Sequence, residues 1–359
     1  MTRGKRARWQ RPALKIDRGE IMLIVRAARK TDLDALVRLA EEAGTGFTSL
    51  AVPPEVLEER LAKSEAAFSS PGEEQTEDTY QLMLEDTESG RIVGCSAVKA
   101  MVGVSKPYWD FKIMTLAQHS IEADRRFDMD AMLLVNDFAG ASEVGTLFVS
   151  EAGRGSGAGR LVAQSRYLLI AAGPQRFGEK VLAELRGVVH EDGSSPFFDH
   201  VSRPFFRMDF DDADRLSAAT DNQFILDLGP QHLIYVDLLP EAARAVIGKV
   251  HKDGEGAYNL LKWEGFHYDR YVDVFDGGPL VSNWTENIRT LRESREVTVK
   301  SATTSGGATG ILSTDRFDDF RTCQAQVVDD GDIVGVSYDT MQALDLREGD
   351  RARFWRHKG

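Results

Sequence analysis

The sequence has few cysteines, no long apolar run and no excess of basic residues. Its 359 residues include only 2 cysteines, which argues against a disulfide framework and a cysteine-based zinc site. No apolar run approaches the ~20 residues that span a bilayer. The formal net charge of −13 argues against a general binder of nucleic-acid phosphates. These absences predict a cytoplasmic protein that binds no nucleic acid, no membrane and no metal ion.

The first 21 residues are basic, but they lack the apolar stretch of a secretory signal. Seven arginines and lysines within the first eighteen positions raise the alternative of nucleic-acid binding. The apolar segment that opens at Met22 is typical of a first strand. We therefore expect residues 1–21 to form a disordered basic extension that precedes the folded protein.

The rest of the chain alternates between strand and helix patterns, which predicts a mixed α/β fold. Residues 105–142 show few clear periods and are interpreted as an insertion. The polar stretch 290–310 predicts a linker, and the turn-rich tail beyond it predicts a small β-barrel-like module. The main segments are expected as strands at 21–28, 80–103 (a hairpin), 146–150, 180–189, 233–239 and 266–276, helices at 29–44, 53–68, 160–173, 240–251 and 257–265, and a short helix plus strand at 195–210.

The most informative stretch is TLFVSEAGRGSGAGR (146–160), in which glycine stands at every second position from Gly153 to Gly159. A strand pattern precedes these glycines and a helix pattern follows them. Bare glycines let a phosphate approach the backbone, and the N–H groups of a helix N-terminus attract its charge. This arrangement predicts a site that binds phosphate groups.

Two well-known phosphate loops fit this stretch poorly. A Walker A loop needs Gly-Lys-Ser/Thr, whereas Arg160 follows the last glycine here. A dinucleotide-binding fingerprint fits as Gly153-x-Gly155-x-x-Ala158, with Glu184 near the expected acidic position. However, hairpin strands precede this fingerprint, and Glu184 lies inside its strand pattern rather than at the end.

A third pattern, Arg154-x-x-Gly157-x-Gly159, resembles the Arg/Gln-x-x-Gly-x-Gly/Ala signature of GNAT-type acyltransferases. In that fold the loop binds the pyrophosphate of coenzyme A (CoA). The strand and helix of IVRAARKTDLDALVRLAEEAG resemble the opening of the same fold. The resemblance favours this interpretation over the dinucleotide site and over a flexible surface turn. The pyrophosphate-binding residues that it implies are Arg154, Gly155, Gly157, Gly159 and Arg160.

Longer segments resemble one family, the arginine N-succinyltransferases of bacterial arginine catabolism. They run in order from about residue 22 to 295: SGRIVGCSAV, SEVGTLFV, ELRGVV, SPFF, FFRMDF, VIGKVH, EGFHYDRYVDVFDGGP and IRTLRESR. The resemblance implies succinyl transfer from succinyl-CoA to the α-amine of L-arginine, with CoA as a co-substrate and no permanently bound cofactor. An acyltransferase for another basic amine such as ornithine, or a non-catalytic CoA-binding subunit, remains an alternative.

The resemblance also implies roles for individual residues. Leu147 resembles the position that contacts succinyl-CoA in this family. Because its side chain is apolar, we expect the backbone of Leu147, Phe148 and Val149 to bind the ligand. The alternative, a leucine in the core of a strand, is compatible with this role. His251, in VIGKVH, resembles a proton donor and is expected at the C-terminus of helix 240–251, where the dipole favours imidazolium. A capping histidine is the alternative there, and His232 is the second candidate.

Arginine must be recognised by acidic groups, because its guanidinium is a permanent cation. Glu143 and Asp137 are candidates for this contact, and surface acids are the alternative. Thr48 and Ser49 lie in the loop after the first helix, which lines the acceptor site in this fold. A helix-end turn is the alternative for these two hydroxyls.

The repeated pattern of an apolar short helix and an aromatic strand, at 195–210 and 257–276, suggests tandem acyltransferase-like lobes; packing of two similar units is the alternative. The expected domains are an acyl-CoA-binding lobe at 22–212, a second lobe carrying His251 at 213–295, and a linker with a small β module at 296–359. Homo-oligomers or paired subunits are expected partners, beside L-arginine and succinyl-CoA.

Overall fold

A computed structural model describes residues 22–44, 47, 49–72, 74–155, 157–220 and 222–357. The main-sheet strands are β1 (Leu23–Ala27), β2 (Thr79–Asp86), β3 (Ile92–Lys99), β4 (Asp110–Ser120), β5 (Arg125–Val135), β6 (Ser142–Val149), β7 (Lys180–Glu184), β8 (Ile234–Tyr235), β9 (His267–Asp273) and β10 (Pro279–Trp284). The remaining strands are β11 (Arg295–Ser301), β12 (Ala308–Thr314), β13 (Arg321–Asp330), β14 (Ile333–Val336) and β15 (Arg351–Arg356). The helices are α1 (Leu33–Ala43), α2 (Pro54–Ser69), α3 (Ala158–Ala172), α4 (Arg203–Phe206), α5 (Phe210–Ala219), α6 (Gln223–Leu228), α7 (Glu241–Arg244), α8 (Glu255–Glu264), α9 (Arg289–Glu293) and α10 (Tyr338–Ala343).

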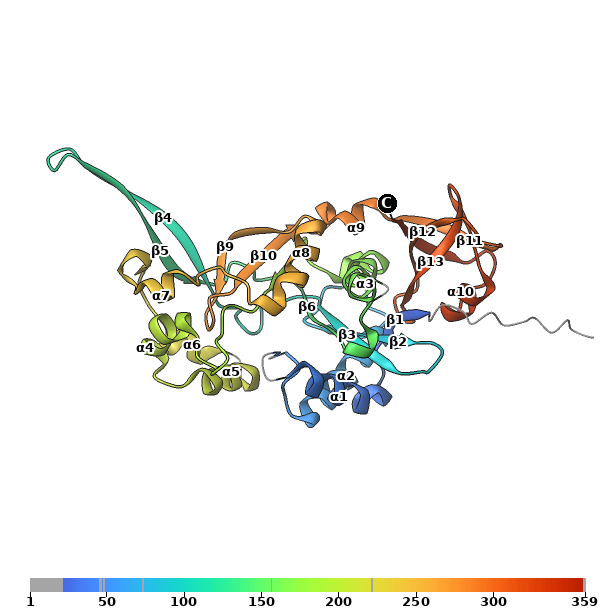
Figure 1. Cartoon of the computed structure of the whole chain (residues 1–359), viewed down its shortest axis with the longest axis horizontal. Coiled ribbons are helices and arrows are strands. Elements are labelled where there is room, and N and C mark those ends of the chain that lie inside the picture. Colours follow the sequence, from blue (N-terminus) through green and yellow to red (C-terminus); the bar gives the residue numbers. More distant parts are fainter. Residues whose placement is uncertain are drawn as a thin grey trace, which may run out of the picture.

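The described strands form one continuous hydrogen-bonded sheet with the order β12-β15-β11-β14-β13-β1-β2-β3-β6-β7-β10-β9-β4-β5-β8. An additional pairing of β12 with β13 closes the first five strands into a barrel, at the right of Figure 1. The predicted mixed α/β fold and the small C-terminal β-barrel are therefore confirmed. None of the described helices is long and apolar enough to cross a membrane.

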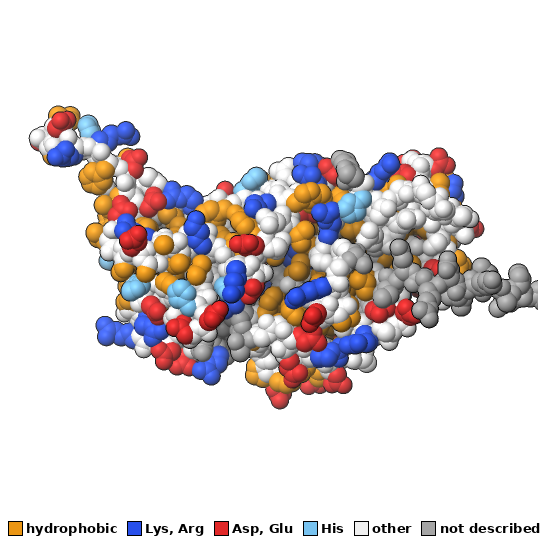
Figure 2. All heavy atoms as spheres, in the orientation of Figure 1, with side chains coloured by type: hydrophobic (Ala, Val, Ile, Leu, Met, Phe, Trp, Pro, Cys, Tyr) orange, Lys and Arg blue, Asp and Glu red, His pale blue; other side chains and the backbone are white. Residues whose placement is uncertain are grey.

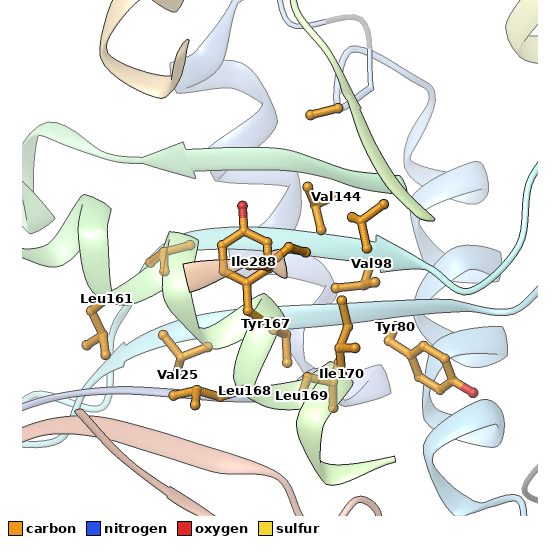
Figure 3. Close-up of a cluster of buried hydrophobic side chains, with 14 of the residues drawn as sticks. Val25, Tyr80, Val98, Val144, Leu161, Tyr167, Leu168, Leu169, Ile170 and Ile288 are labelled. Carbon is orange, nitrogen blue, oxygen red and sulfur yellow. The ribbon is translucent and has the colours of Figure 1, made fainter. Parts of the chain in front are cut away.

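Helices cover both faces of the central strands. On one face α3 packs onto β3 and β6, where Leu161 and Leu168 join Val98 and Val144 in a buried cluster (Figure 3). Most side chains of α3 are buried, and these include the polar Gln164 and Ser165 and the charged Arg166. On the other face α1 and α2 pack over β2 and β3. The central strands are consequently apolar on both sides.

The first strand joins the main sheet to the barrel. β1 pairs with β2 on one edge and with β13 on the other, with Ile24 opposite Cys323. The side chain of Ile24 lies in the barrel core, while that of Val25 lies in the α3 cluster. β1 therefore connects the main sheet to the barrel, both by its backbone pairing and by the packing of its side chains.

Part of the predicted linker is a strand. Residues 290–310 contain most of α9, all of β11 and the start of β12. In β11 the apolar Val297 and Val299 point into the barrel core, and polar residues alternate with them. Because half of the strand faces solvent, its composition resembles that of a loop.

The region expected as a second lobe has no sheet of its own among the described residues. β9 and β10 join the same sheet as β6 and β7. The segment 195–210 is helical and contains no strand, so it does not match the helix and strand at 257–276. The unassigned insertion is mostly the long β4–β5 hairpin, which projects at the left of Figures 1 and 2 and carries Ile121, 80% exposed, at its tip.

Candidate active site at the divergence of β6 and β7

Two neighbouring strands separate in the middle of the sheet. β6 and β7 run parallel, and their pairing is restricted to Ser142 with Val181 and Glu143 with Leu182. The hydroxyl of Ser142 fixes the closed end, because it accepts the N–H of Gly178 at 2.8 Å. Beyond Glu143 the β7-facing edge of β6 is unpaired. Its backbone donors and acceptors are therefore available to an extended ligand.

The open edge carries a backbone irregularity. Thr146 has φ +51°, in the left-handed region that β-branched residues rarely adopt. The pairing with β3 shifts at the same place, where Cys95 faces Phe148 and Ala97 faces Gly145. Such bulges re-aim backbone groups and are frequent beside active sites.

The predicted CoA contacts lie on this edge. The side chains of Leu147 and Val149 pack against the α3 cluster. Phe148 points to the other face and meets the ring of Phe47 edge-on, with 5.8 Å between ring centroids. The side chains are therefore structural, and the backbone of the same three residues borders the open edge. The two interpretations that the sequence left open for Leu147 are compatible.

The four glycines after β6 have different physical roles. A Cβ on Gly153 would lie 2.9 Å from Val93, so this glycine serves packing against β3. Gly155 (φ +102°) and Gly157 (φ +79°) adopt left-handed conformations that lead into α3. Gly159 lies within the first turn of α3 and has open space around its missing side chain. The N–H groups at the start of a helix have no acceptor within the helix, so this turn can donate to a bound anion.

A cavity of about 170 Å³ adjoins the glycine loop. Arg160 lies in its wall, with Nη1 3.4 Å from Nε2 of His357 and its guanidinium stacked over the ring of Trp263. Arg154 is exposed at the start of the loop. The barrel supplies part of the wall, so it contributes to the same site. The cavity is lined by Gly157, Arg160, Leu161, Ile311, Gln324 and His357.

The two acids predicted to bind the guanidinium are already paired. Glu143 accepts a hydrogen bond from Nζ of Lys99 at 2.7 Å. Asp137 accepts bonds from Nζ of Lys112 and the hydroxyl of Tyr271, both at 2.8 Å. These side chains lie on the face of the sheet opposite α3, which is also the face of α1 and α2.

The predicted hydroxyls give less information. Thr48 lies outside the described residues. Ser49 is half-buried, and its carbonyl accepts a hydrogen bond from Nη1 of Arg60 at 2.6 Å. Its contact with an acceptor substrate stays a prediction.

Glu184 is a further candidate for the site. The sequence pattern indicated it only as the acidic residue of a dinucleotide-binding fingerprint. It ends β7, two residues beyond the last pairing with β6, so it lies beside the opening at about the level of the bulge. Its Oε2 accepts a hydrogen bond from the hydroxyl of Tyr108 at 2.7 Å. The side chain of Glu184 is exposed as a whole, but other protein groups surround its carboxyl. The desolvation that they cause, together with the negative charge of Glu143, raises the pKa of Glu184 to about 7.

The surroundings of His251 differ from those predicted. The helix expected over 240–251 ends at Arg244, since Gly248 (φ +68°) turns the chain and fits against Tyr268 with no room for a Cβ. His251 instead precedes the short 3₁₀ helix Lys252–Gly254, which leads into α8. The prediction of a helix C-terminus at this histidine was therefore wrong, and its dipole argument does not apply.

His251 nevertheless lies next to the opening. Its backbone N–H donates to the carbonyl of Arg186 at 2.8 Å, just beyond the end of β7. Its side chain is 12% exposed, and Nδ1 accepts the N–H of Asp253 at 3.3 Å. The same Nδ1 lies 3.4 Å from Oδ2 of Asp253, which can accept its proton when the ring is charged and leave Nε2 with the other proton. His232, by contrast, is exposed before β8, five strands away from β7.

Comparisons with known proteins identify the family of this chain. The family described as arginine N-succinyltransferase beta subunit matches residues 23–290, and its C-terminal domain matches residues 295–356. Relatives named arginine N-succinyltransferase from Enterobacter sp. (strain 638) and Escherichia coli (strain 55989 / EAEC) are 34% identical, over 93% of this chain and 98% of theirs. The structure of arginine/ornithine succinyltransferase subunit AI from Pseudomonas aeruginosa is 32% identical, with a TM-score of 0.85 over 95% of this chain and 100% of that one. The chain therefore belongs to the arginine N-succinyltransferase family.

Proposed function

We propose that this enzyme transfers the succinyl group of succinyl-CoA to the α-amine of L-arginine, in arginine catabolism. The products are N2-succinyl-L-arginine and free CoA. Family membership supports the reaction, and one structural observation carries the site: the unpaired edge of β6 runs directly into the glycine-capped N-terminus of α3. An extended thioester with a phosphate end fits such an edge and such a terminus.

Succinyl-CoA binds in this proposal as a co-substrate along β6. Its pyrophosphate lies against the N–H groups of the glycine loop and the first turn of α3, with Arg154 and Arg160 as flanking cations. Its pantetheine arm bonds to the backbone of Leu147–Val149. The thioester carbonyl then lies near the Thr146 bulge, where preset backbone N–H groups stabilise the oxyanion.

The chemistry needs a base and an acid on the two sides of this carbonyl. The carboxylate of Glu184 takes a proton from the α-ammonium of arginine, and the freed amine attacks the thioester carbon. The tetrahedral intermediate loses the second proton of its nitrogen to solvent water and collapses, and the carbon–sulfur bond breaks. The leaving thiolate takes the Nε2 proton of the His251 imidazolium, so the thiol and the new amide are the products and His251 is left neutral, to be reprotonated from solvent.

We expect the purified chain to release free thiol from succinyl-CoA in the presence of L-arginine. The measurement is thiol formation with arginine, ornithine, lysine and buffer alone. Ornithine is included because the Pseudomonas aeruginosa relative is named for both amino acids. Faster turnover of ornithine than arginine would favour the alternative acceptor. Tight CoA binding without turnover of any amine would instead indicate a non-catalytic subunit.

The glycine loop gives a test of cofactor binding. Gly159→Ala is expected to raise the KM for succinyl-CoA by about 10- to 100-fold, because a methyl group enters the space proposed for a phosphate bonded to charged or backbone donors. The melting temperature should stay equal or rise, since alanine favours the helix. Gly153→Ala is the matched control, and its clash with Val93 should lower stability. An unchanged KM of Gly159→Ala for succinyl-CoA would contradict the proposal that a phosphate binds at this turn.

A further inference from the structure

One buried carboxyl group near the proposed acceptor site is incompletely bonded. Asp110, the first residue of β4, is 1% exposed, and its Oδ2 has no hydrogen-bond partner among the residues that the structure describes. Buried carboxyl oxygens in folded proteins are normally hydrogen-bonded or paired with a cation, because desolvation is costly. An unpartnered oxygen at this place therefore requires an explanation.

The surroundings of Asp110 are negative. Asp273 lies directly opposite on β9, and its Oδ1 accepts the N–H groups of Phe275 and Asp276. The charges of Glu184, Glu143 and Asp137, added to the dominant effect of desolvation, raise the pKa of Asp110 well above its usual range. The protonated form of this carboxyl group is therefore more favoured than in a solvent-exposed aspartic acid. A bound cation would stabilise its ionised form.

Asp110 shares its face of the sheet with Glu184. The cross-strand partners Lys112, Tyr271, Leu280 and Glu184 form one row across β4, β9, β10 and β7. Asp110 stands two residues from Lys112 on β4, so it projects from the same face in the neighbouring row.

The lysines of this face do not neutralise Asp110. Lys99 is bonded to Glu143, and Lys112 is bonded to Asp137. Lys180, on the same face of β7, has its Nζ over the rings of Phe138 and Trp284. Among the described residues, three carboxyl groups on this face have no lysine or arginine partner, at Glu184, Asp110 and Asp273. Backbone N–H groups already bind Oδ1 of Asp273, which leaves Glu184 and Asp110. They suit a substrate that carries two cationic groups.

We propose that Asp110 binds the guanidinium of L-arginine while Glu184 faces the α-amine. The inference rests on the proposed function and specifies its substrate contacts. A guanidinium supplies several N–H donors in one plane, which can satisfy the open oxygen of Asp110 and leave a donor for neighbouring oxygens. The acids predicted from the sequence, Asp137 and Glu143, then have the role of holding Lys112 and Lys99.

The test compares arginine with citrulline, whose urea group has a similar shape but no charge. Wild-type turnover of arginine is measured first, so that failure of the reaction itself is recognised separately. For Asp110→Asn we expect the preference in kcat/KM for arginine over citrulline to fall by about 10- to 100-fold. The loss should be in KM for arginine, with kcat/KM for citrulline changed by less than about threefold, which also shows that the variant is folded.

Two further variants make the comparison specific. Asp269→Asn makes the same substitution at an exposed position of β9 and should leave the preference unchanged. Asp137→Asn tests the rival acid. If Asp137→Asn abolishes the preference while Asp110→Asn retains it, the proposal is overturned.

A measurement on the wild-type enzyme covers the case in which Asp110→Asn does not fold. The groups that face Asp110 are Glu143, Asp137, Asp273, Glu184 and Tyr108. Because a raised pKa leaves Asp110 protonated at low pH, the arginine/citrulline ratio of kcat/KM should rise with pH. Ionisation of the α-amine and its base affects both substrates and cancels in the ratio. A ratio that stays constant over the whole pH range in which the enzyme is folded and active would contradict the proposal.

Discussion

Replacing Glu184 with glutamine is expected to lower kcat for L-arginine by about 10²- to 10⁴-fold, the usual contribution of a general base. Glutamine keeps the size of the side chain and can still accept the hydrogen bond of Tyr108, but it cannot take a proton. The wild-type rate should rise with pH through about 7, because Glu184 acts as a base only when it is ionised. The variant should lose this limb of the profile. Steady-state kinetics from about pH 5.5 to 9 measures both effects.

Tyr108→Phe provides a second, independent readout. The hydroxyl of Tyr108 stabilises the ionised form of Glu184, so its removal should raise the pKa of the carboxyl. The limb of the pH profile should therefore move to higher pH in this variant. Glu179→Gln, an exposed acid just before β7, controls for the change in charge. A full rate with an unshifted profile for Glu184→Gln would assign the base to another group or to water.

His251→Ala should lower kcat by about 10²-fold at pH 7, with less than about a threefold change in the KM for succinyl-CoA. The imidazole is proposed to protonate the leaving thiolate, and it lies beside the end of β7 rather than in the phosphate site. A thiol pKa of about 8.5 makes this protonation less important at high pH. The defect should therefore shrink when the same variant is assayed near pH 9.

The second histidine named from the sequence serves as the comparison. His232→Ala changes an exposed ring five strands from β7, so its kinetics should match those of the wild type at every pH. A large defect in His232→Ala, with none in His251→Ala, would reverse the two roles. A defect in His251→Ala that is equally large at pH 7 and 9 would indicate a structural rather than a proton-donating role.

Local patterns predicted much of the fold because they depend on near neighbours in the chain. The apolar run at β1 and the periodicity of α3 appear in the structure near the predicted positions. The break at Gly248 and the strand β11 were missed for a related reason. The first depends on close contact with Tyr268, and the second depends on which face of an alternating strand meets the barrel core.

The site was predictable where its chemistry is concentrated in one segment. The glycine loop is such a segment, and the sequence placed it between a strand and a helix. Glu184 and Asp110 are separated by 74 residues and belong to β7 and β4, which lie on one sheet with β10 and β9 between them. Neither shows a local signal, because the property that distinguishes them is the neighbourhood of other carboxyl groups. The choice of Asp137 and Glu143 shows the same limit, since their lysine partners come from other strands.

The pairing of β1 with strand β13 of the barrel has a consequence for synthesis of the protein. About 300 residues separate Ile24 from Cys323, so at roughly 5–20 residues per second the ribosome needs some 15–60 seconds to make the partner of β1. During that interval one edge of the first strand stays open on the nascent chain. The barrel, translated last, is therefore the element that seals the edge exposed first, and a stalled or truncated chain would keep an apolar strand ready to pair with another molecule.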